Sequence, residues 1–473
     1  MLAVLKRFCY TISMRRILYL ITLFSALLFA LVTCAPKPPP APSLYAPTNL
    51  PPILPSGDFP AYIEASRART AVVNQAIGTP LSPEGIAAIG PFEVKPPPTG
   101  KNCRGGTFGD YDKGVLLIHG LNDTPYSMKD LARRFSEACY MVRAIRLPGH
   151  GTVPGDLIKI GLPAWRDAVA KAAWSFRGHV DRLVIAGFDL GANLALDAAH
   201  DLGLPPELEL DGIVMLAPAF RYDPPQFGPA ATGPGGDALW GDVFDETEVL
   251  RYQSTVQPGV DAVNGLGAAL FERQAPRQIP LFVVGSADDA VTDPQMIQDW
   301  FCGQSTTPRK LLWYTSYPCR PVPNCRCTVR SRNPNDDQRE VCAINRSIAH
   351  DLSFDGNTED FDLEVPRDCR PGKRLKPNAS ILDLSHTGLL AAADNPRYGV
   401  TSGRRDCLHY SWELDTPEER VCVGELVGEG ERYLRYGEAS PGNLENYILR
   451  RLTYNPDFDF MAKAILDFLE KND

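Results

Sequence analysis

The sequence predicts an α/β fold, with a mostly parallel sheet covered by helices on both faces. From Gly114 onward, short apolar runs alternate with stretches of helical spacing, as in strands joined by crossover helices. The runs are continuously apolar, as at 115–118, which is typical of strands buried on both faces. The run at 182–186 leads into a glycine-flanked turn and then directly into a helical pattern at 192–199. This order is the one expected of strand–turn–helix units in a parallel sheet.

The composition is that of an ordinary globular protein, with 44% hydrophobic and 22% charged residues. A length of 473 residues exceeds what one core needs, so one large domain with additions and two domains are both open. The net charge of −9 argues against a nucleic-acid partner, because nucleic-acid-binding proteins normally present a basic face. Solubility is the simplest explanation of the acidity.

Residues 1–34 are predicted to be a signal peptide or a lipoprotein or membrane anchor. Basic residues precede an apolar run at 17–32, which ends in Leu31-Val32-Thr33-Cys34. This ending resembles the lipobox of bacterial lipoproteins, which implies lipidation of Cys34, although Thr33 departs from the small residue usual there. An uncleaved anchor helix with an incidental cysteine is the alternative. Either way, we expect the rest of the chain in the cell envelope, tethered to a membrane on its exported side.

Residues 35–100 are predicted to be a proline-rich linker and N-terminal extension. Ten prolines fall between 35 and 60, and proline fixes φ and lacks an amide hydrogen, so this part should be an extended spacer. A weakly helical piece follows at 62–76.

Residues 101–473 are predicted to form the main domain. Two stretches break its alternation of strands and helices: a region at 219–277 placed like a lid, and a cysteine-rich insertion at 315–379 without apolar periodicity. The expected strands are 115–118, 141–145, 182–186, 212–216 and 280–284, and the expected helices lie around 128–135, 164–176 and 192–199.

Cysteine usage agrees with export. Apart from Cys9 and Cys34, the chain has ten cysteines, an even number that suits an oxidising compartment and up to five disulfides. The pairing cannot be deduced from the sequence. Cys325-Arg326-Cys327 lacks the paired C-x2-C spacing of a zinc site, so we expect no metal.

The most informative stretch is Gly187-Phe188-Asp189-Leu190-Gly191, which lies between an apolar run and a helical pattern. Strand, sharp turn and helix form the context of a nucleophile elbow, whose glycines let strand and helix approach. Serine is usual at the centre, and Asp189 stands there instead. The sequence His119-Gly120-Leu121-Asn122 follows the first strand, and the backbone N–H groups of Leu121 and Leu190 are the expected oxyanion-hole donors.

An acid and a histidine follow the elbow at the ends of later strands. The acid is expected within Gly285-Ser286-Ala287-Asp288-Asp289, and we favour Asp288 over Asp289. His386 follows the apolar segment 381–384 and is the expected base, with His409 as the fallback. His119 and His150 are interpreted as structural.

Together these residues resemble the α/β-hydrolase superfamily, most closely its bacterial esterase, monoacylglycerol-lipase and serine-aminopeptidase-like branches. The resemblance covers roughly 114–310 and 380–400. It implies the α/β-hydrolase fold and hydrolysis of an ester or related acyl bond in a small, lipid-like substrate, without a cofactor. The implied triad is Asp189, Asp288 and His386.

Asp189 leaves three functions open. The helix N-terminus favours its ionised form, but attack of a carboxylate on an ester carbonyl would give a high-energy anhydride. Attack on a saturated carbon gives an ordinary ester, which a water activated by His386 could hydrolyse. Haloalkane dehalogenases and epoxide hydrolases work in this way, but the Trp and Pro usual in those branches are replaced by Leu190 and Asn122. The third alternative is a catalytically inactive binding or scaffold protein of the cell envelope.

The aspartate branches also bring paired lid tyrosines. Tyr222 and Tyr252 are the weak candidates for these in the present chain. We expect in the first place an exported hydrolase that retains activity with Asp189.

Overall fold

The computed structural model describes the chain from residue 42 with gaps. The described residues are 42–97, 103, 107, 109–201, 203–222, 239–244, 246, 248–304, 308–315, 343–347, 381–400, 434–438, 440, 443 and 448–472. The predicted anchor with Cys34, the fallback His409 and nearly all of the cysteine-rich insertion lie outside these residues. Ser43–Asp473 form one compact unit by their contacts.

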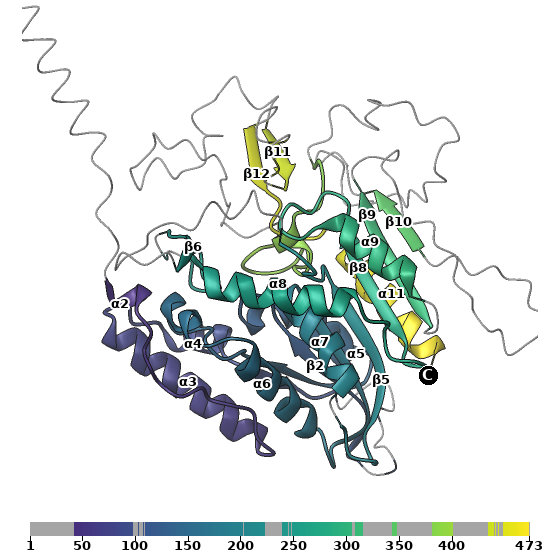
Figure 1. The fold of residues 1–473 in the computed structure, drawn as a ribbon. Helices are drawn as coiled ribbons and strands as arrows, with labels where there is room; N and C mark the ends of the chain where they lie inside the picture. The colour runs from purple at the N-terminus through teal and green to yellow at the C-terminus, as the bar shows by residue number, and fades with distance from the viewer. Residues whose placement is uncertain are drawn as a thin grey trace, which may run out of the picture. The chain divides into compact units, whose positions relative to one another are not determined.

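The unit is built on an eight-stranded sheet with the order β1-β3-β2-β4-β5-β8-β9-β10 (Figure 1). All neighbouring pairs are parallel except β1 with β3, so the predicted mostly parallel sheet is confirmed. The strands are β1 (Phe92–Val94), β2 (Tyr111–Ile118), β3 (Tyr140–Ile145), β4 (Val180–Phe188), β5 (Glu209–Leu216), β8 (Leu281–Ser286), β9 (Arg309–Thr315) and β10 (Ala343–Ser347).

Helices cover both faces of the sheet, as the continuous apolar runs predict. In β4, Ile185 packs into one core cluster, whereas its neighbours Val184 and Ala186 pack into the other. Successive side chains of a strand point to opposite faces, so a strand covered on both sides must be apolar at every position. One cluster includes α3 (Phe59–Ala76), α6 (Leu162–Trp174), α7 (Leu190–Asp201), α8 (Gln257–Phe271) and α9 (Pro294–Gly303), and the other includes α5 (Lys129–Glu137) and α11 (Phe458–Lys471).

Short elements complete the described part of the chain. Two pairs of strands stand apart from the main sheet, and the remaining helices are one or two turns long. They are β6 (Trp240–Asp242) with β7 (Thr255–Val256), β11 (Leu434–Gly437) with β12 (Ile448–Arg451), α2 (Pro42–Tyr45), α4 (Pro83–Ile89), and the 3-10 helices η1 (Pro125–Met128), η2 (Pro154–Ile158) and η4 (His386–Gly388).

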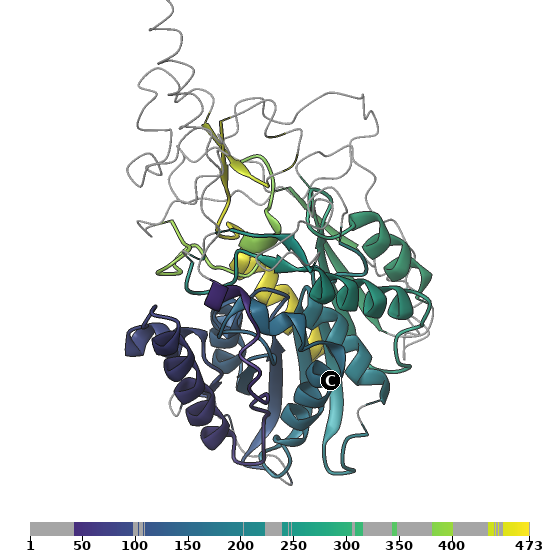
Figure 2. The same cartoon turned by 60° about the vertical axis from the view of Figure 1, so that its left-hand side comes forward.

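The N-terminal extension is part of the fold rather than a spacer. Strand β1 adds an antiparallel edge to the sheet beside β3. Helix α3, purple in Figure 2, packs its buried residues into the core cluster on one face of the sheet. The buried guanidinium of Arg143 lies 4.8 Å from the Phe59 ring and 5.0 Å from the Phe176 ring, and pairs with Glu93 at 2.8 Å. The predicted boundary at residue 101 therefore lies inside the compact unit, because apolar anchors in the extension outweigh the tendency of its prolines to stay extended.

The Phe59→Ala variant measures how much the packing of the extension contributes to the free energy of unfolding. Phe59→Ala removes a fully buried ring that also faces Arg143, so we expect the free energy of unfolding to fall by about 3–5 kcal/mol. Val72→Ala, on the exposed face of the same helix, should change it by less than about 0.5 kcal/mol. Urea denaturation of both variants checks the difference, and equal effects would mean that the extension does not stabilise the domain.

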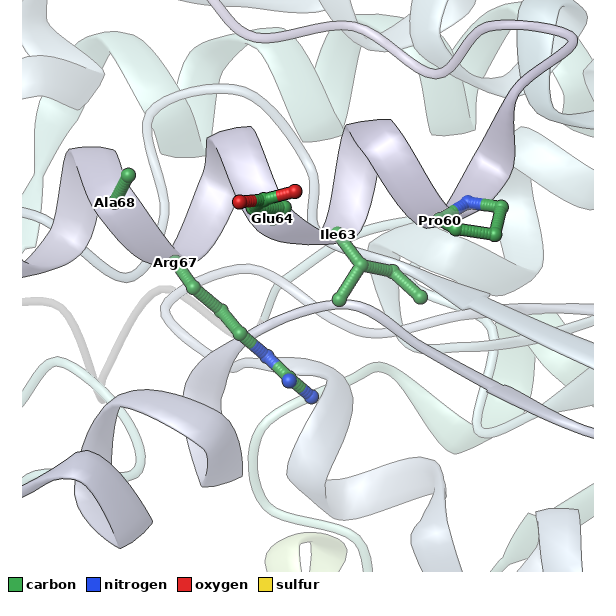
Figure 3. Close-up of a pocket in the computed structure, with 5 residues that line it drawn as sticks. All are labelled: Pro60, Ile63, Glu64, Arg67 and Ala68. Atoms are coloured by element: carbon green, nitrogen blue, oxygen red, sulfur yellow. The ribbon is translucent and has the colours of Figure 1, made fainter.

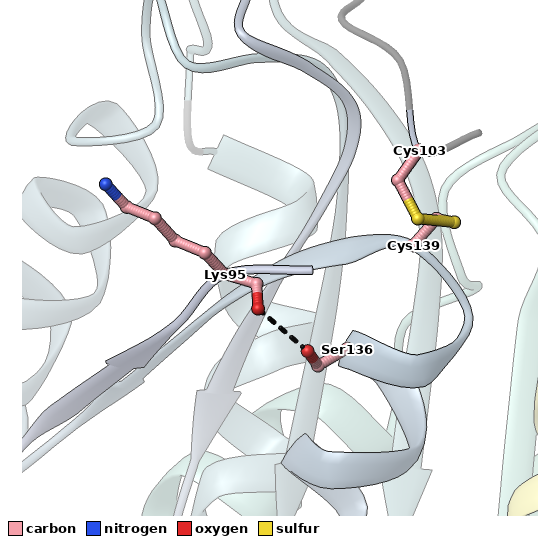
Figure 4. Close-up of a disulfide and its surroundings, with 4 residues drawn as sticks. All are labelled: Lys95, Cys103, Ser136 and Cys139. Carbon is pink, nitrogen blue, oxygen red and sulfur yellow. Dashed lines mark hydrogen bonds between the residues drawn. A yellow bond between two sulfur atoms is a disulfide. The ribbon is translucent and has the colours of Figure 1, made fainter. Parts of the chain in front are cut away.

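A disulfide joins Cys103 to Cys139, which precedes β3 (Figure 4). The hydroxyl of Ser136, in the last turn of α5, donates to the carbonyl oxygen of Lys95 at 3.1 Å beside it. The segment entering β2 is thereby fastened to the turn that enters β3. Disulfides persist mainly in oxidising compartments.

Candidate active site

The turn after β4 places Asp189 at the carboxyl edge of the sheet. Asp189 has φ +56°, a left-handed conformation unusual for a residue with a side chain, and α7 starts at the next residue. A Cβ at Gly187 would lie 2.0 Å from the carbonyl oxygen of Gly191, and one at Gly191 would lie 2.1 Å from that of Ile118. Both glycines are therefore needed for the strand and helix to meet, as the elbow pattern predicts.

The two carboxylate oxygens of Asp189 have different surroundings. Oδ2 accepts the backbone N–H of Leu121 at 2.8 Å and the hydroxyl of Tyr222 at 2.8 Å. Oδ1 has no hydrogen-bond partner among the described residues and lies 3.9 Å from Nε2 of His386. The side chain is only 3% exposed. One oxygen is thus held by donors, while the other is buried without a hydrogen bond and faces the histidine.

Burial raises the pKa of Asp189 above its ordinary value. His386 and the donors at Leu190, Tyr222 and Leu121 favour the carboxylate and limit the rise. The same carboxylate, added to burial, raises the pKa of the Tyr222 hydroxyl, which therefore stays protonated as a donor. Gly120 makes room for this arrangement, since a Cβ there would lie 2.7 Å from Oδ2.

His386 begins the 3-10 helix η4 and is fixed from two sides. Its backbone N–H donates to Oε2 of Glu438 at 2.8 Å, and its Nδ1 lies 2.7 Å from Oδ2 of Asp289. Burial opposes the charged imidazolium, but the carboxylates of Asp289, Asp189 and Glu438 raise the pKa of His386 to about 9. The free site therefore holds an imidazolium between two carboxylates at neutral pH.

The partner of His386 is Asp289, so the preference for Asp288 is wrong. Oδ1 of Asp289 accepts the backbone N–H groups of Val291 and Thr292, which turns its other oxygen toward the histidine. Burial alone would raise the pKa of Asp289, but the contact with His386 and these amides lowers it. The charge of Asp288 acts on Asp383 instead: burial, and after it the charge of Asp288, raises the pKa of Asp383 to about 8.

The histidine predicts a measurable pH dependence of stability. Its pKa is about 9 in the fold and 6.5 in the unfolded chain, so its stabilisation is complete below pH 6.5 and is lost as the pH rises through 9. We expect the wild type to lose about 2–4 kcal/mol more than His386→Gln between pH 6.5 and 9. Urea unfolding at several pH values measures this. Asp383 titrates in both proteins and cancels from the difference, and parallel curves would contradict the prediction.

The structure brings the predicted Leu121 N–H to Asp189 and places Leu190 directly after it, at the start of α7. The structure adds Tyr222 to the site, although the sequence made it only a weak candidate for a lid tyrosine. It follows β5 and forms an antiparallel β-bridge with Thr292, on the segment that carries Asp289. Tyr252 lies elsewhere: its hydroxyl donates to the carbonyl oxygen of Gly149 and accepts from the N–H of Thr152.

His119 serves the fold rather than the site. Its Nδ1 lies 2.8 Å from the carbonyl oxygen of Gly120, and its Nε2 accepts the N–H of Leu147 at 3.0 Å. These contacts join the loop carrying Leu121 to the loop after β3. Burial keeps the pKa of His119 well below its ordinary value, so the ring is neutral.

A pocket of about 410 Å³ lies along α3, lined by Pro60, Ile63, Glu64, Arg67 and Ala68 (Figure 3). None of these residues contacts Asp189 or His386, so this pocket is not the place of the chemistry. Within the described ranges, no three His, Cys, Asp or Glu side chains gather in a way that could hold a metal. Of the helices in that part of the chain, none combines the length and the apolar character that crossing a membrane requires.

The geometry suits a carboxylate nucleophile. If Oδ1 forms a bond to carbon, Oδ2 becomes the carbonyl oxygen of an ester that already lies against Leu121 N–H and the Tyr222 hydroxyl. Water attack on Cγ would then develop negative charge on Oδ2, where the donors are already in place. His386 lies on the open side and could accept the proton of that water.

Part of the chain is similar to known α/β hydrolases. Residues 115–321 match the model of the alpha/beta hydrolase family. A thermostable monoacylglycerol lipase of Bacillus sp. (strain H-257) is 26% identical over 205 residues, which span 42% of this chain and 79% of that enzyme. A soluble variant of the monoglyceride lipase of Saccharomyces cerevisiae is 15% identical, with a TM-score of 0.34, over 48% of this chain and 81% of that chain. A structure from work on the metagenome-derived lipolytic enzymes LipS and LipT is 28% identical, with a TM-score of 0.36, over 47% and 86%.

Proposed function

Since the chain belongs to the α/β-hydrolase superfamily, we propose that it is a lipase- or esterase-like hydrolase of small lipophilic substrates in which Asp189 is the nucleophile. In this proposal His386 is the base, Asp289 orients it, and Leu121, Leu190 and Tyr222 stabilise the oxyanion. The observation that carries the proposal is the asymmetry of Asp189: Oδ2 is bound by two donors, whereas Oδ1 has no hydrogen-bond partner among the described residues and faces His386.

In the first step, Oδ1 attacks an electrophilic saturated carbon of the substrate. A carbon–oxygen bond forms, the bond from that carbon to the leaving group breaks, and the leaving group departs with the electron pair. For an ester substrate the leaving group is the carboxylate of the acyl part, and for a haloalkane it is the halide. For an epoxide it is the ring oxygen, which stays attached to the substrate as an alkoxide and takes a proton from the His386 imidazolium. Attack on the carbonyl carbon would instead give an anhydride, which is less stable than the ester it replaces.

In the second step, water attacks Cγ of Asp189 and gives its proton to Nε2 of His386. The tetrahedral intermediate carries its charge on Oδ2, and its collapse releases an alcohol and restores the carboxylate. Formation of the covalent ester removes the negative charge of Asp189, which is one of the causes of the raised pKa of His386. The pKa of His386 therefore falls when the ester forms, although the larger contribution of Asp289 remains, and the imidazolium gives its proton to the departing group or to water before it acts as the base.

A covalent-intermediate experiment tests this function. Purified wild type, His386→Ala and Asp189→Asn are incubated with panels of esters, epoxides and haloalkanes and followed by intact mass. We expect turnover by the wild type, an adduct that accumulates on Asp189 in His386→Ala, and no adduct in Asp189→Asn. Asp167→Asn, a surface carboxylate paired with Lys171, is the matched control and should behave like the wild type.

An oxygen-18 label shows whether water attacks the Asp189 ester itself. If water attacks Cγ, turnover in oxygen-18 water places the label in the Asp189 carboxylate. Product formation without such label would contradict the aspartate nucleophile. If no substrate in the panels gives a product or an adduct, the hydrolase proposal is contradicted.

A non-catalytic binding or scaffold role is the second candidate. It is favoured by one observation: Oδ2 of Asp189 occupies the position facing the Leu121 N–H and the Tyr222 hydroxyl, where a substrate oxyanion would bind in a serine esterase. Asp189→Ser separates the two. A gain of esterase activity and of labelling by a fluorophosphonate would mean that the remaining machinery is competent, whereas an inert variant favours the scaffold.

We further propose that the protein is exported and tethered to a membrane through its N-terminus. The apolar run at 17–32 with Cys34 at its end supports this, and so does the disulfide between Cys103 and Cys139. The intact mass of protein extracted from membranes tests it. A chain that begins at a diacylglyceryl Cys34 is expected, and an unmodified chain in the soluble fraction would contradict the tether.

A further inference from the structure

We infer that Glu438 is a positioning residue of the proposed site: its carboxylate holds the main chain of His386, so that the imidazole ring stays between Asp289 and Asp189. This role rests on the proposed hydrolase function and would be exerted through His386 rather than on the substrate. Glu438 follows β11 and lies beyond residues 115–321, which match the family model, so that match gives it no role.

The contact between Glu438 and His386 is a buried hydrogen bond. Oε2 of Glu438 accepts the backbone N–H of His386 at 2.8 Å, and Glu438 is only 1% exposed. His386 begins the 3-10 helix η4, and the first N–H groups of a helix have no acceptor within the helix itself. A charged acceptor makes such a bond about twice as strong as a neutral one. Glu438 therefore fixes the residue that carries the proposed base at its own main chain.

The strand pair β11 and β12 (Figure 1) also holds the residues that lead to His386. The backbone N–H of Leu382 donates to the carbonyl oxygen of Tyr436, in β11, at 2.8 Å. The hydroxyl of Ser385 donates to the carbonyl oxygen of Leu452, which directly follows β12. Both strands thus contribute to the placement of the turn, and Glu438 adds the contact at the histidine itself.

Buried groups in turn fix the position of Glu438. Its backbone N–H donates to Oδ1 of Asp383 at 2.6 Å. Nδ2 of Asn443 donates to the carbonyl oxygen of Glu438 at 3.0 Å and to Oδ2 of Asp383 at 2.8 Å. A Cβ at Gly437 would lie 2.4 Å from Oδ1 of Asp383, so this close approach requires glycine. A side chain held in this way can serve as a fixed support for a second residue.

The charges in this region are compatible with a buried carboxylate at Glu438. Together with the carboxylates on either side of the ring, Glu438 acts on the imidazolium of His386, which offsets its negative charge. On the other side of Glu438, burial and then the charge of Asp288 raise the pKa of Asp383 to about 8. Asp383 is therefore mostly protonated at neutral pH, and the like-charge repulsion between it and Glu438 is small.

Three substitutions in the full chain separate the reach of Glu438 from its charge. Glu438→Gln keeps an oxygen that can accept the His386 N–H but removes the charge, Glu438→Asp keeps the charge but is one methylene shorter, and Glu438→Ala removes both. We expect kcat of Glu438→Gln to stay within about threefold of the wild type. In Glu438→Asp and Glu438→Ala, kcat should fall about a hundredfold while KM changes by less than about threefold, because a misplacement of about 1 Å costs that much.

A second readout needs no substrate. The proton between Nδ1 of His386 and Asp289 lies in a charge-assisted hydrogen bond of 2.7 Å and should give a separate downfield signal in proton NMR. We expect this signal in the wild type and in Glu438→Gln, and its loss in Glu438→Asp and Glu438→Ala. If the wild type hydrolyses nothing, the proposed function fails, and the signal alone still decides whether Glu438 positions the ring.

Asp130→Ala is the matched control. Asp130 is 8% exposed, and its Oδ2 accepts the backbone N–H of Ala392, in the loop after η4, at 2.8 Å. The variant removes a buried acceptor from the same loop but not from His386, so it should lose stability and keep both kcat and the signal. Glu438→Asp serves if Glu438→Ala does not fold. Wild-type kcat and signal in Glu438→Asp would overturn the inference, and so would equal losses in Glu438→Gln or in Asp130→Ala.

Discussion

Asp289→Asn is expected to lower kcat by roughly a thousandfold to ten-thousandfold with whichever substrate the panels identify. The carboxylate of Asp289 contacts Nδ1 of His386 at 2.7 Å and holds the proton on that nitrogen. An asparagine can turn its amide N–H₂ toward Nδ1, which stabilises the tautomer with the proton on Nε2 and removes the base from the side facing Asp189. Steady-state and single-turnover kinetics measure the loss.

Asp288→Asn is the matched control. It changes the adjacent residue, whose charge acts on Asp383 rather than through a contact with His386, so we expect kcat to fall by less than about tenfold. Because water attack is the step that needs the base, Asp289→Asn should also accumulate the covalent ester on Asp189. Equal losses in the two variants would contradict the assignment of the acid.

Gly191→Ala is expected to abolish the native fold at ordinary temperatures. The added Cβ would lie 2.1 Å from the carbonyl oxygen of Ile118 and 2.7 Å from that of His119, both backbone atoms of β2 and the turn after it. Neither can move without separating β2 from α7, so we expect a loss of more than about 4 kcal/mol. Circular dichroism and urea unfolding of purified protein measure it.

Gly265→Ala is the control that separates crowding from the generic effect of replacing glycine. It lies within α8 with nothing within 4 Å of the added Cβ, so we expect a gain of up to about 1 kcal/mol. A stable, well-folded Gly191→Ala would mean that the elbow is looser than its contacts indicate.

The central strands and the elbow could be predicted from the sequence because each depends on a local pattern. The apolar run at 115–118 lies in β2, and the pair Gly187 and Gly191 marks a turn tight enough for β4 to run directly into α7. Strands at the edges carry weaker patterns. β1 is three residues long, β9 contains charged residues at its start, and β10 lies inside a polar insertion, so periodicity did not reveal them.

The arrangement of the site depends on contacts that the local sequence pattern does not show. Asp288 and Asp289 are identical in type and adjacent, and only the amides of Val291 and Thr292 decide which one faces His386. Tyr222 is a single tyrosine in a glycine- and proline-rich stretch, and its role depends on a bridge to a segment 70 residues later. Likewise, the prolines of the extension predict a spacer, and only the contact of Phe59 with Arg143 shows that the extension packs on the domain.

The bridge between Tyr222 and Thr292 couples the segment that contacts Asp189 to the segment that carries Asp289. Tyr222 covers Asp189, which is almost inaccessible, while the segment of Thr292 holds Asp289 against the histidine. A side-chain rotation of Tyr222 alone would uncover Asp189 without a change at Asp289, but a backbone displacement of Tyr222 would move both residues. A larger substrate that needs such a displacement would therefore misalign His386 as it entered, so the proposed hydrolase would discriminate by size through its turnover rate as well as its affinity.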